Sequence, residues 1–130
     1  VFDTSALIPV CLHPNREPAH IFRQTITQHD VFSSPDAFNE LLTVLSRDKF
    51  NAWQPLQQRL LWAKFFKESV VLIKPTEPVN ACRDPKDNKF LELALAAKAD
   101  FLVSSDIHLL EMHPFRQIAI LSLPSFKENV

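Results

Sequence analysis

Glycine is absent from this 130-residue chain, and cysteine occurs only twice. Without glycine, the chain cannot form glycine-rich phosphate loops of the Rossmann or P-loop type. Any left-handed helix end must then be formed by Asn, Asp or another residue type. Cys11 and Cys82 form no CxxC pattern, so we interpret them as buried free thiols of a cytoplasmic protein.

Long apolar runs are also absent. No stretch approaches the roughly 20 residues needed to cross a bilayer, and no segment resembles a signal peptide, so we expect no membrane association. The chain begins in an apolar strand pattern without an initiator Met, and we therefore expect a few natural residues to precede Val1.

Neither sign of charge dominates, since Lys and Arg total 14 and Asp and Glu total 15, a formal net charge of −1. This balance argues against a protein that binds long nucleic-acid duplexes through its overall charge, but it allows a nuclease with a local basic patch. The five histidines show no zinc-binding spacing. A hydrophobic content of 46% over this length predicts one globular domain, residues 1–130.

Apolar periodicity and capping residues predict alternating strands and helices. This order is typical of an α/β fold: a central parallel sheet of about five strands with helices on both faces, which makes three layers. The strands are expected at 1–3, 30–33, 70–73, 100–104 and 118–121. Helices are expected at 6–12, after the capping types Thr4 and Ser5, and at 17–28, 35–48, 84–98 and 107–112. Another helix is expected to start at Gln54-Pro55, with apolar positions up to Phe66, and the chain ends in a polar tail.

Four acidic residues stand out by their local settings: Asp3, Glu40, Asp87 and Asp106. Asp3 and Asp106 each follow a strand pattern, and in a parallel α/β sheet that edge is where ligands bind. Carboxylates gathered there repel one another unless a cation lies among them, and oxygen ligands suit Mg²⁺ or Mn²⁺. The alternative role for Asp3 and Asp106 is capping of the next helix, although Thr4 and Ser5 are also capping types near Asp3.

Asp84 and Asp87 flank the start of a predicted helix, where acidic residues are favoured by the helix dipole. With Pro85 at the first helical position, Asp84 is the better cap, and we favour Asp87 as the metal ligand. Asp84 stays an alternative ligand, and Asn88 is a candidate to share the role. Glu40, taken alone, is more typical of a solvated helix glutamate.

Polar and basic residues accompany the acids. Ser104 points to the same strand face as Asp106 if the chain stays extended, and its hydroxyl is a candidate to orient water or contact phosphate. The basic residues nearest the acidic pair are candidate RNA phosphate contacts, with a solvated face as the alternative: Arg83, Lys86 and Lys89.

Four parts of the chain form a recognisable set: Phe2-Asp3-Thr4-Ser5-Ala6-Leu7, the internal Glu40, the stretch from Arg83 to Ala94, and that from Ala99 to Asp106. Together they resemble the PIN domain family. The stretch from Arg83 to Ala94 is similar to the subgroup described as VapC-like toxin components of toxin–antitoxin systems.

The resemblance implies a small α/β endoribonuclease with an acidic pocket that binds Mg²⁺ or Mn²⁺. Asp3, Glu40, Asp87 and Asp106 match the metal-binding acids of the family, although the subgroup often has two adjacent acids where this chain has Asp87-Asn88. Ser5 and Ser104 match polar positions that accompany the acids. The resemblance further implies a homodimer and a small antitoxin protein as partner.

The same residues allow two rival functions. A catalytically silent domain would use the same pocket to bind RNA or an antitoxin. A phosphoryl-transfer domain would use Asp3 as an aspartyl nucleophile. The companion acid usual two residues later is Ser5 here, which argues against the second rival.

Overall fold

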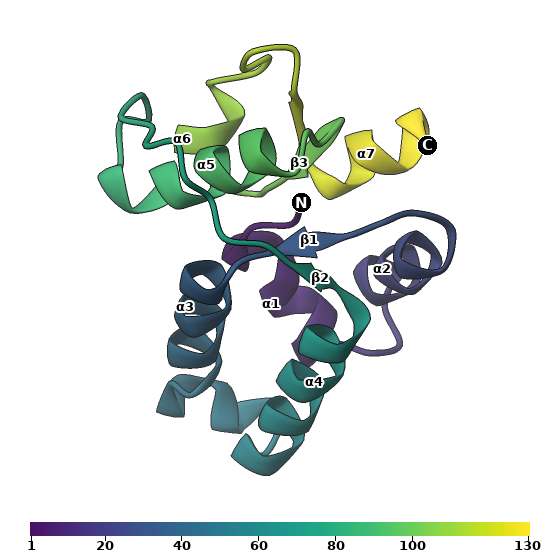
Figure 1. The fold of residues 1–130 in the computed structure, drawn as a ribbon. Coiled ribbons are helices and arrows are strands. Elements are labelled where there is room, and N and C mark those ends of the chain that lie inside the picture. Colours follow the sequence, from purple (N-terminus) through teal and green to yellow (C-terminus); the bar gives the residue numbers. More distant parts are fainter.

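The computed structural model describes residues 1–130, and Figure 1 shows its helices arranged around short parallel strands. The α/β class expected from the sequence is confirmed. In chain order the elements are α1 (Thr4–Leu12), α2 (Glu17–Gln28), β1 (Phe32–Ser33), α3 (Pro35–Leu45), the 3-10 helix η1 (Asp48–Ala52), α4 (Leu56–Ser69), β2 (Val71–Leu72), the 3-10 helix η2 (Pro85–Asp87), α5 (Asn88–Ala96), β3 (Phe101–Val103), α6 (Ile107–Leu110), β4 (Ala119–Leu121) and α7 (Leu123–Asn129).

Local capping chemistry decides where several helices begin. Ser34 accepts a hydrogen bond from the backbone N–H of Ala37, and Pro35 occupies the first turn of α3. Asp84 caps η2 in the same way, with Pro85 next. Both starts were predicted, because the acceptor side chain binds a free N–H group of the helix end and the proline that follows has no N–H group to satisfy.

The structure does not show a single sheet of about five strands. It has two parallel pairs, β1 with β2 and β3 with β4. The first residues of the chain add one parallel bridge, between Phe2 and Val103. Figure 1 shows β3 with α5, α6 and α7 on one side of the N-terminus, and β1 and β2 with α1 to α4 on the other. The hydrogen-bonded ladder is therefore interrupted between the Val1–Asp3 segment and β1.

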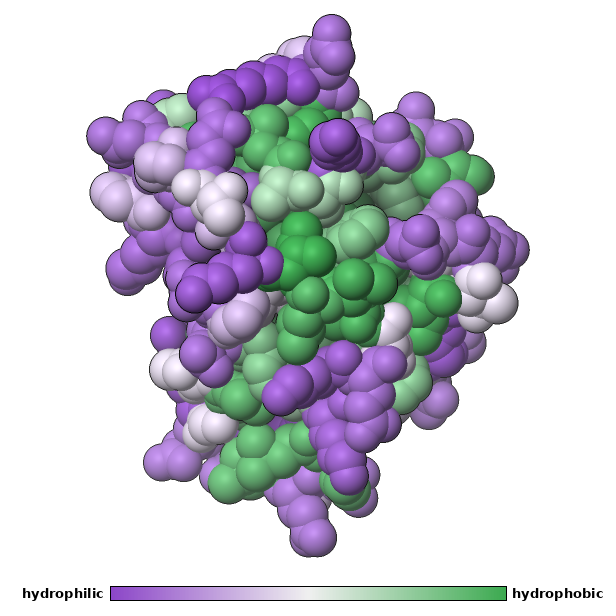
Figure 2. Space-filling model, in the orientation of Figure 1, coloured by the Kyte–Doolittle hydropathy of each residue, from purple (hydrophilic) through white to green (hydrophobic).

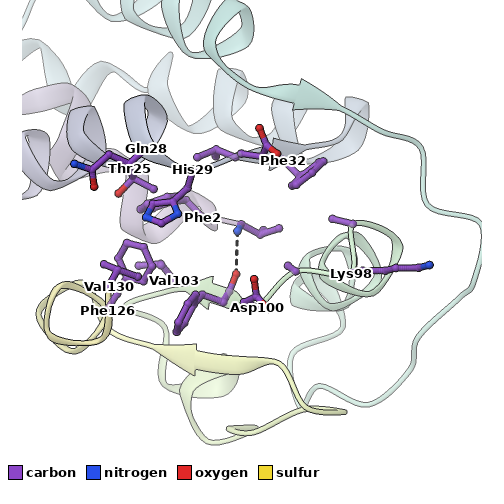
Figure 3. Close-up of a pocket in the computed structure, with 16 residues that line it drawn as sticks. Phe2, Thr25, Gln28, His29, Phe32, Lys98, Asp100, Val103, Phe126 and Val130 are labelled. Atoms are coloured by element: carbon purple, nitrogen blue, oxygen red, sulfur yellow. Dashed lines mark hydrogen bonds between the residues drawn. The ribbon is translucent and has the colours of Figure 1, made fainter.

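A cavity of about 550 Å³ lies at this interruption. Figure 3 shows Phe32 on one wall, Asp100 and Lys98 on the other, and Phe2 between them. Two apolar cores hold the halves together, and each contains residues from both: Val103 of β3 belongs to the first core and Ala37 of α3 to the second. Phe22, Leu41 and Phe66 are buried among α1 to α4, and Leu91 and Ile120 are buried around α5, β3 and β4.

The connection between α3 and α4 is bound by a fully buried cation, Arg59 of α4. Its guanidinium donates to the carbonyl oxygens of Leu45 at 2.5 Å, Arg47 at 3.0 Å and Gln54 at 3.2 Å, and also to the side chain of Asn51. Helix α3 was expected to continue to about Asp48. It ends at Leu45, whose carbonyl accepts from this guanidinium together with that of Arg47, and η1 follows.

The polar tail predicted at the C-terminus forms helix α7, which is capped by Ser122. Its one buried side chain, Phe126, packs edge-to-face on Phe2 and Phe101, with ring centroids 5.9 and 5.3 Å apart. A single aromatic anchor therefore docks an otherwise polar segment. No helix of the structure has both the length and the apolar character needed to span a membrane.

Helix α5 ends without glycine. Lys98 adopts a positive φ of 51° after the C-cap Ala97, and the N–H of Ala99 donates back to the carbonyl of Ala94. This is the left-handed helix end that glycine most often forms. The expectation that other residue types take this conformation is confirmed, and lysine was not among those named.

Candidate active site

The parallel bridge between Phe2 and Val103 brings two chain segments to the same edge of a half-sheet. The backbone N–H of Asp3 donates to the carbonyl of Val103 at 3.0 Å. Asp3 follows one strand and Ser104 follows the other, so both lie at the carboxyl ends of parallel strands. This is the edge at which open α/β sheets place their ligands.

Asp3 is 2% exposed and has hydrogen bonds on both carboxylate oxygens. Oδ1 accepts from the N–H of Ala6 at 2.9 Å, which makes Asp3 itself the N-cap of α1. Ser5 donates to Oδ1 at 2.7 Å, and Ser104 donates to Oδ2 at 2.5 Å. The capping alternative therefore applies to Asp3, rather than to Thr4 or Ser5. Capping uses one oxygen and leaves the other facing the strand edge.

Burial raises the pKa of Asp3 to about 6, and the charge of Asp106 adds to this rise. The three donors that contact the carboxylate oppose it, because they stabilise the ionised form. Asp3 is thus a carboxylate held in a fixed orientation, in a setting that disfavours its negative charge.

The two serines connect the loops that carry Asp3 and Asp106. Ser104 accepts the backbone N–H of Asp106 at 2.9 Å while it donates to Asp3. Ser5 accepts the backbone N–H of Ser105 at 3.0 Å. The hydroxyl of Ser104, predicted to orient water or contact phosphate, is here engaged with protein groups, and both serines position the acids.

Asp106 caps helix α6, because its side chain accepts the N–H of His108 at 2.9 Å. The capping alternative is therefore present at this residue too. Asp106 nevertheless contributes a negative charge to Asp3 and to Asp87. The tertiary structure thus brings three acids from separate segments within electrostatic reach.

Asp87 has the least satisfied carboxylate of the set. It is buried at the end of η2, and its Oδ2 atom has no hydrogen-bond partner. Burial is the main cause of a pKa raised to about 7. Asp106 is the next cause, because a second carboxylate close by favours the protonated form of Asp87, and Asp84 and Asp3 add smaller effects.

Glu40 lies on α3, and both of its oxygens are engaged. Thr4 donates its hydroxyl to Oε2, and the Lys89 ammonium on α5 donates to Oε1 at 2.8 Å. The sequence reasoning treated Thr4 only as a capping type and missed this contact. Its position directly after Asp3 was the available signal.

The remaining predicted residues have mixed settings. Asp84 caps η2 by accepting the N–H of Lys86 at 3.1 Å, as expected. The side-chain oxygen of Asn88 accepts the N–H groups of Ala81 and Cys82, so it holds the preceding loop.

Arg83 forms an exposed ion pair with Glu111 at 2.9 Å. Lys86 is exposed and has no ion pair in the structure.

Both cysteines are free and buried, as predicted. Cys82 borders the acidic cluster, and its thiol donates to the carbonyl of His108 at 3.4 Å. Burial raises its pKa, and the charges of Asp87 and Asp106 add to this rise. The thiol is therefore kept in its neutral form beside the acids.

The donor chemistry of this pocket fits a divalent cation. As the side chains stand, no group of three His, Cys, Asp or Glu residues is arranged to hold a metal ion. The acids are nevertheless clustered, their charges are mutually unfavourable, and Asp87 Oδ2 is buried without a partner. Oxygen-only donors in such a setting suit a hard cation such as Mg²⁺ or Mn²⁺.

Together, the fold and this site define an α/β domain with a cluster of carboxylates at the carboxyl ends of its parallel strands. Residues 1–108 match the family described as the PIN domain. The chain belongs to the PIN domain family, whose members are generally nucleases, and at that level it is a nuclease-type domain.

One curated relative is similar over most of the chain. It is the "Uncharacterized protein MJ1680" of Methanocaldococcus jannaschii, which is 29% identical over 114 residues. The match covers 86% of this chain and 73% of the relative. No solved structure was found to match the chain.

Proposed function

We propose that this protein is a metal-dependent endoribonuclease that cleaves phosphodiester bonds of cytoplasmic RNA. Asp3, Glu40, Asp87 and Asp106 would hold Mg²⁺ or Mn²⁺. The observation that carries this proposal is the buried, unpartnered Oδ2 atom of Asp87, within reach of the charges of Asp106 and Asp3. A cation would offset the mutual repulsion and the desolvation that raise the pKa values of these acids.

The residues of the chain supply orientation. Ser5 and the N–H of Ala6 hold Asp3 Oδ1, and Ser104 holds Asp3 Oδ2. When bound, Mg²⁺ or Mn²⁺ supplies Lewis acidity at the scissile phosphate and lowers the pKa of water. Asp87 gains its negative charge as the pH rises through about 7, so the pocket attracts cations more strongly above that pH.

Basic residues near the pocket are proposed to contact RNA phosphates. Arg83 has a side chain that is 70% exposed although it is paired with Glu111, and Lys86 is exposed without an ion pair. Lys89 is held by Glu40. Because the net charge of the chain is −1, binding would rest on these local contacts rather than on long-range attraction.

The resemblance to toxin components extends the proposal to partners, namely a second copy of this chain and a small antitoxin protein that covers the acidic pocket. Exposed apolar side chains support a protein interface. On α4 they are Leu56, Leu60, Leu61 and Phe65, which are 41–57% exposed, and on β2 they are Val71 and Leu72. Figure 2 shows hydrophobic surface over β2 and along α4. Light scattering of the purified chain tests the homodimer, and a monomer at micromolar concentration would contradict it.

The catalytic proposal is tested by incubating purified protein with single-stranded and structured RNAs in Mg²⁺, Mn²⁺ or EDTA, beside Asp3→Asn. We expect cleavage that requires the metal and that the substitution abolishes while the variant remains folded. Wild-type activity in Asp3→Asn would overturn the site assignment. A folded protein that binds Mn²⁺ but cuts no RNA would favour the silent binding domain.

A further inference from the structure

Glu40 differs from the other three acids because a cation of the protein already occupies it. Lys89 Nζ lies 2.8 Å from Glu40 Oε1, and the Thr4 hydroxyl binds the other oxygen. The two side chains are 27% and 24% exposed, so water screens their attraction only in part. A divalent ion cannot take both oxygens of this carboxylate while these contacts persist.

Lys89 is a sequence neighbour of another acid of the set. It follows Asp87 by two residues, in the first turn of α5, and reaches back to α3. Asp87 has a carboxylate oxygen without a partner, whereas both oxygens of Glu40 are engaged. The internal pair thus neutralises one acid of the set.

Other carboxylates lie near Lys89 and are available as alternative partners for its ammonium group. A small cavity of about 100 Å³ adjoins Lys89 and is lined by polar residues, among them Asp36 and Glu92. Glu92 lies one turn further along α5 than Lys89, which is the spacing at which helix side chains pair. A displaced Lys89 would therefore keep a carboxylate partner, which lowers the cost of its displacement.

We propose that Lys89 is an internal counter-ion that occupies Glu40 in the absence of a divalent cation and is displaced when the cation binds. Lys89 is then a positioning residue that sets the metal affinity of the site. This inference rests on the proposed function, because it assumes that Glu40 is a metal ligand. A purely structural role, tying α3 to α5, would make the opposite prediction for metal binding.

The test is calorimetric titration with Mn²⁺ of the wild type, Lys89→Met, Lys89→Gln and Lys89→Arg. Both neutral variants should bind Mn²⁺ about three- to tenfold more tightly, since the competing charge is gone. Lys89→Arg should stay within about twofold of wild type because it retains the charge. Lys64→Met is the control, an exposed lysine of α4 without an ion pair, and should also change affinity less than about twofold.

Thermal unfolding gives a second readout without RNA cleavage. Without metal, Lys89→Met should melt slightly below wild type because a half-buried ion pair is lost. Added Mn²⁺ should raise its melting temperature more than that of wild type. Equal or weaker Mn²⁺ affinity in both neutral variants would overturn the counter-ion role.

Failure of this inference can be told from failure of the proposed function. If wild type binds Mn²⁺, Asp3→Asn does not, and the neutral Lys89 variants match wild type, only the counter-ion role is wrong. If wild type binds no Mn²⁺ at millimolar concentration, both are overturned.

Discussion

The Ser104 hydroxyl donates to the Asp3 carboxylate at 2.5 Å, across 101 positions of sequence. The same oxygen accepts the N–H of Asp106 at 2.9 Å, so one serine relates two acids of the site. Ser104 is 1% exposed, and water cannot take its place without rearrangement.

Replacing Ser104 by alanine should therefore destabilise the fold and disturb the site. A buried carboxylate would lose a donor, which costs about 1–3 kcal/mol in unfolding free energy. Urea denaturation measures this loss, and the proposed RNA cleavage should fall with it. Ser105→Ala is the control, since the side chain at 105 is exposed and only its backbone N–H is used. Equal stabilities of the two variants would contradict the structural role of Ser104.

Stability should fall as the pH rises from about 4 to about 6 in metal-free buffer. The folded pKa values of Asp3 and Asp87, about 6 and about 7, exceed the ordinary value of 3.8. The folded state then binds more protons than the unfolded state across this window, so deprotonation favours unfolding. Burial lowers the pKa of the Val1 amino group to about 5, which acts in the opposite direction above that pH and should flatten the curve between pH 6 and pH 7. Denaturant midpoints measured from pH 4 to pH 8 check the sign, and a rise between pH 4 and pH 6 would contradict these pKa directions.

Asp87→Asn should be more stable than wild type at pH 8 without metal, by on the order of 1 kcal/mol, because it removes a buried charge near Asp106. Saturating Mn²⁺ should cancel or reverse this gain, since wild type alone keeps the full ligand set. Asp84→Asn is the matched control: asparagine also caps helices, and no gain is expected there. Thermal unfolding with and without Mn²⁺ measures both effects.

Arg59 should be among the most sensitive residues outside the site. Arg59→Met would leave the carbonyl groups of Leu45, Arg47 and Gln54 without their buried donor, and we expect a loss of about 3 kcal/mol or more. Arg59→Lys should recover only part of it, because an ammonium cannot reproduce the planar set of donors. Arg47→Met, at an exposed side chain, serves as control in the same denaturation series. A change below 1 kcal/mol in Arg59→Met would contradict this role.

Lys98→Gly should stabilise the protein by about 0.5–1 kcal/mol. Lys98 holds a φ of 51°, where a Cβ atom is sterically unfavourable. Lys98→Ala keeps the Cβ atom and should show no such gain. Melting temperatures of the two variants separate the backbone effect from loss of the lysine charge.

Local sequence signals predicted much of the helical framework. Helix α2 was expected at 17–28 and is observed there, and the starts at Ser34-Pro35 and Asp84-Pro85 are confirmed. The end of α3 and the formation of α7 were missed. Both depend on remote partners, the buried guanidinium of Arg59 and the aromatic contacts of Phe126.

The sequence alone also identified the four acids as candidate metal ligands and the serines beside them as accompanying residues. Their catalytic roles remain predictions. Pro85 favoured Asp84 as the cap and Asp87 as the ligand, but the sequence could not show which of these two acids is buried. Asp84 caps a turn at the surface, whereas Asp87, three positions later, is buried with an unpartnered oxygen. Sequence spacing places both residues near a helix start, but only the packing of the folded chain decides which carboxylate is buried away from solvent.

The chain by itself thus determined the family, the α/β class and several helix starts, because capping, proline geometry and apolar periodicity act within a few residues. Only the tertiary structure decided the division of the strands into two parallel pairs, the link from Ser104 to Asp3, and the pairing of Lys89 with Glu40. Burial, charge repulsion and ion pairing act through space, between residues that the sequence separates by dozens of positions.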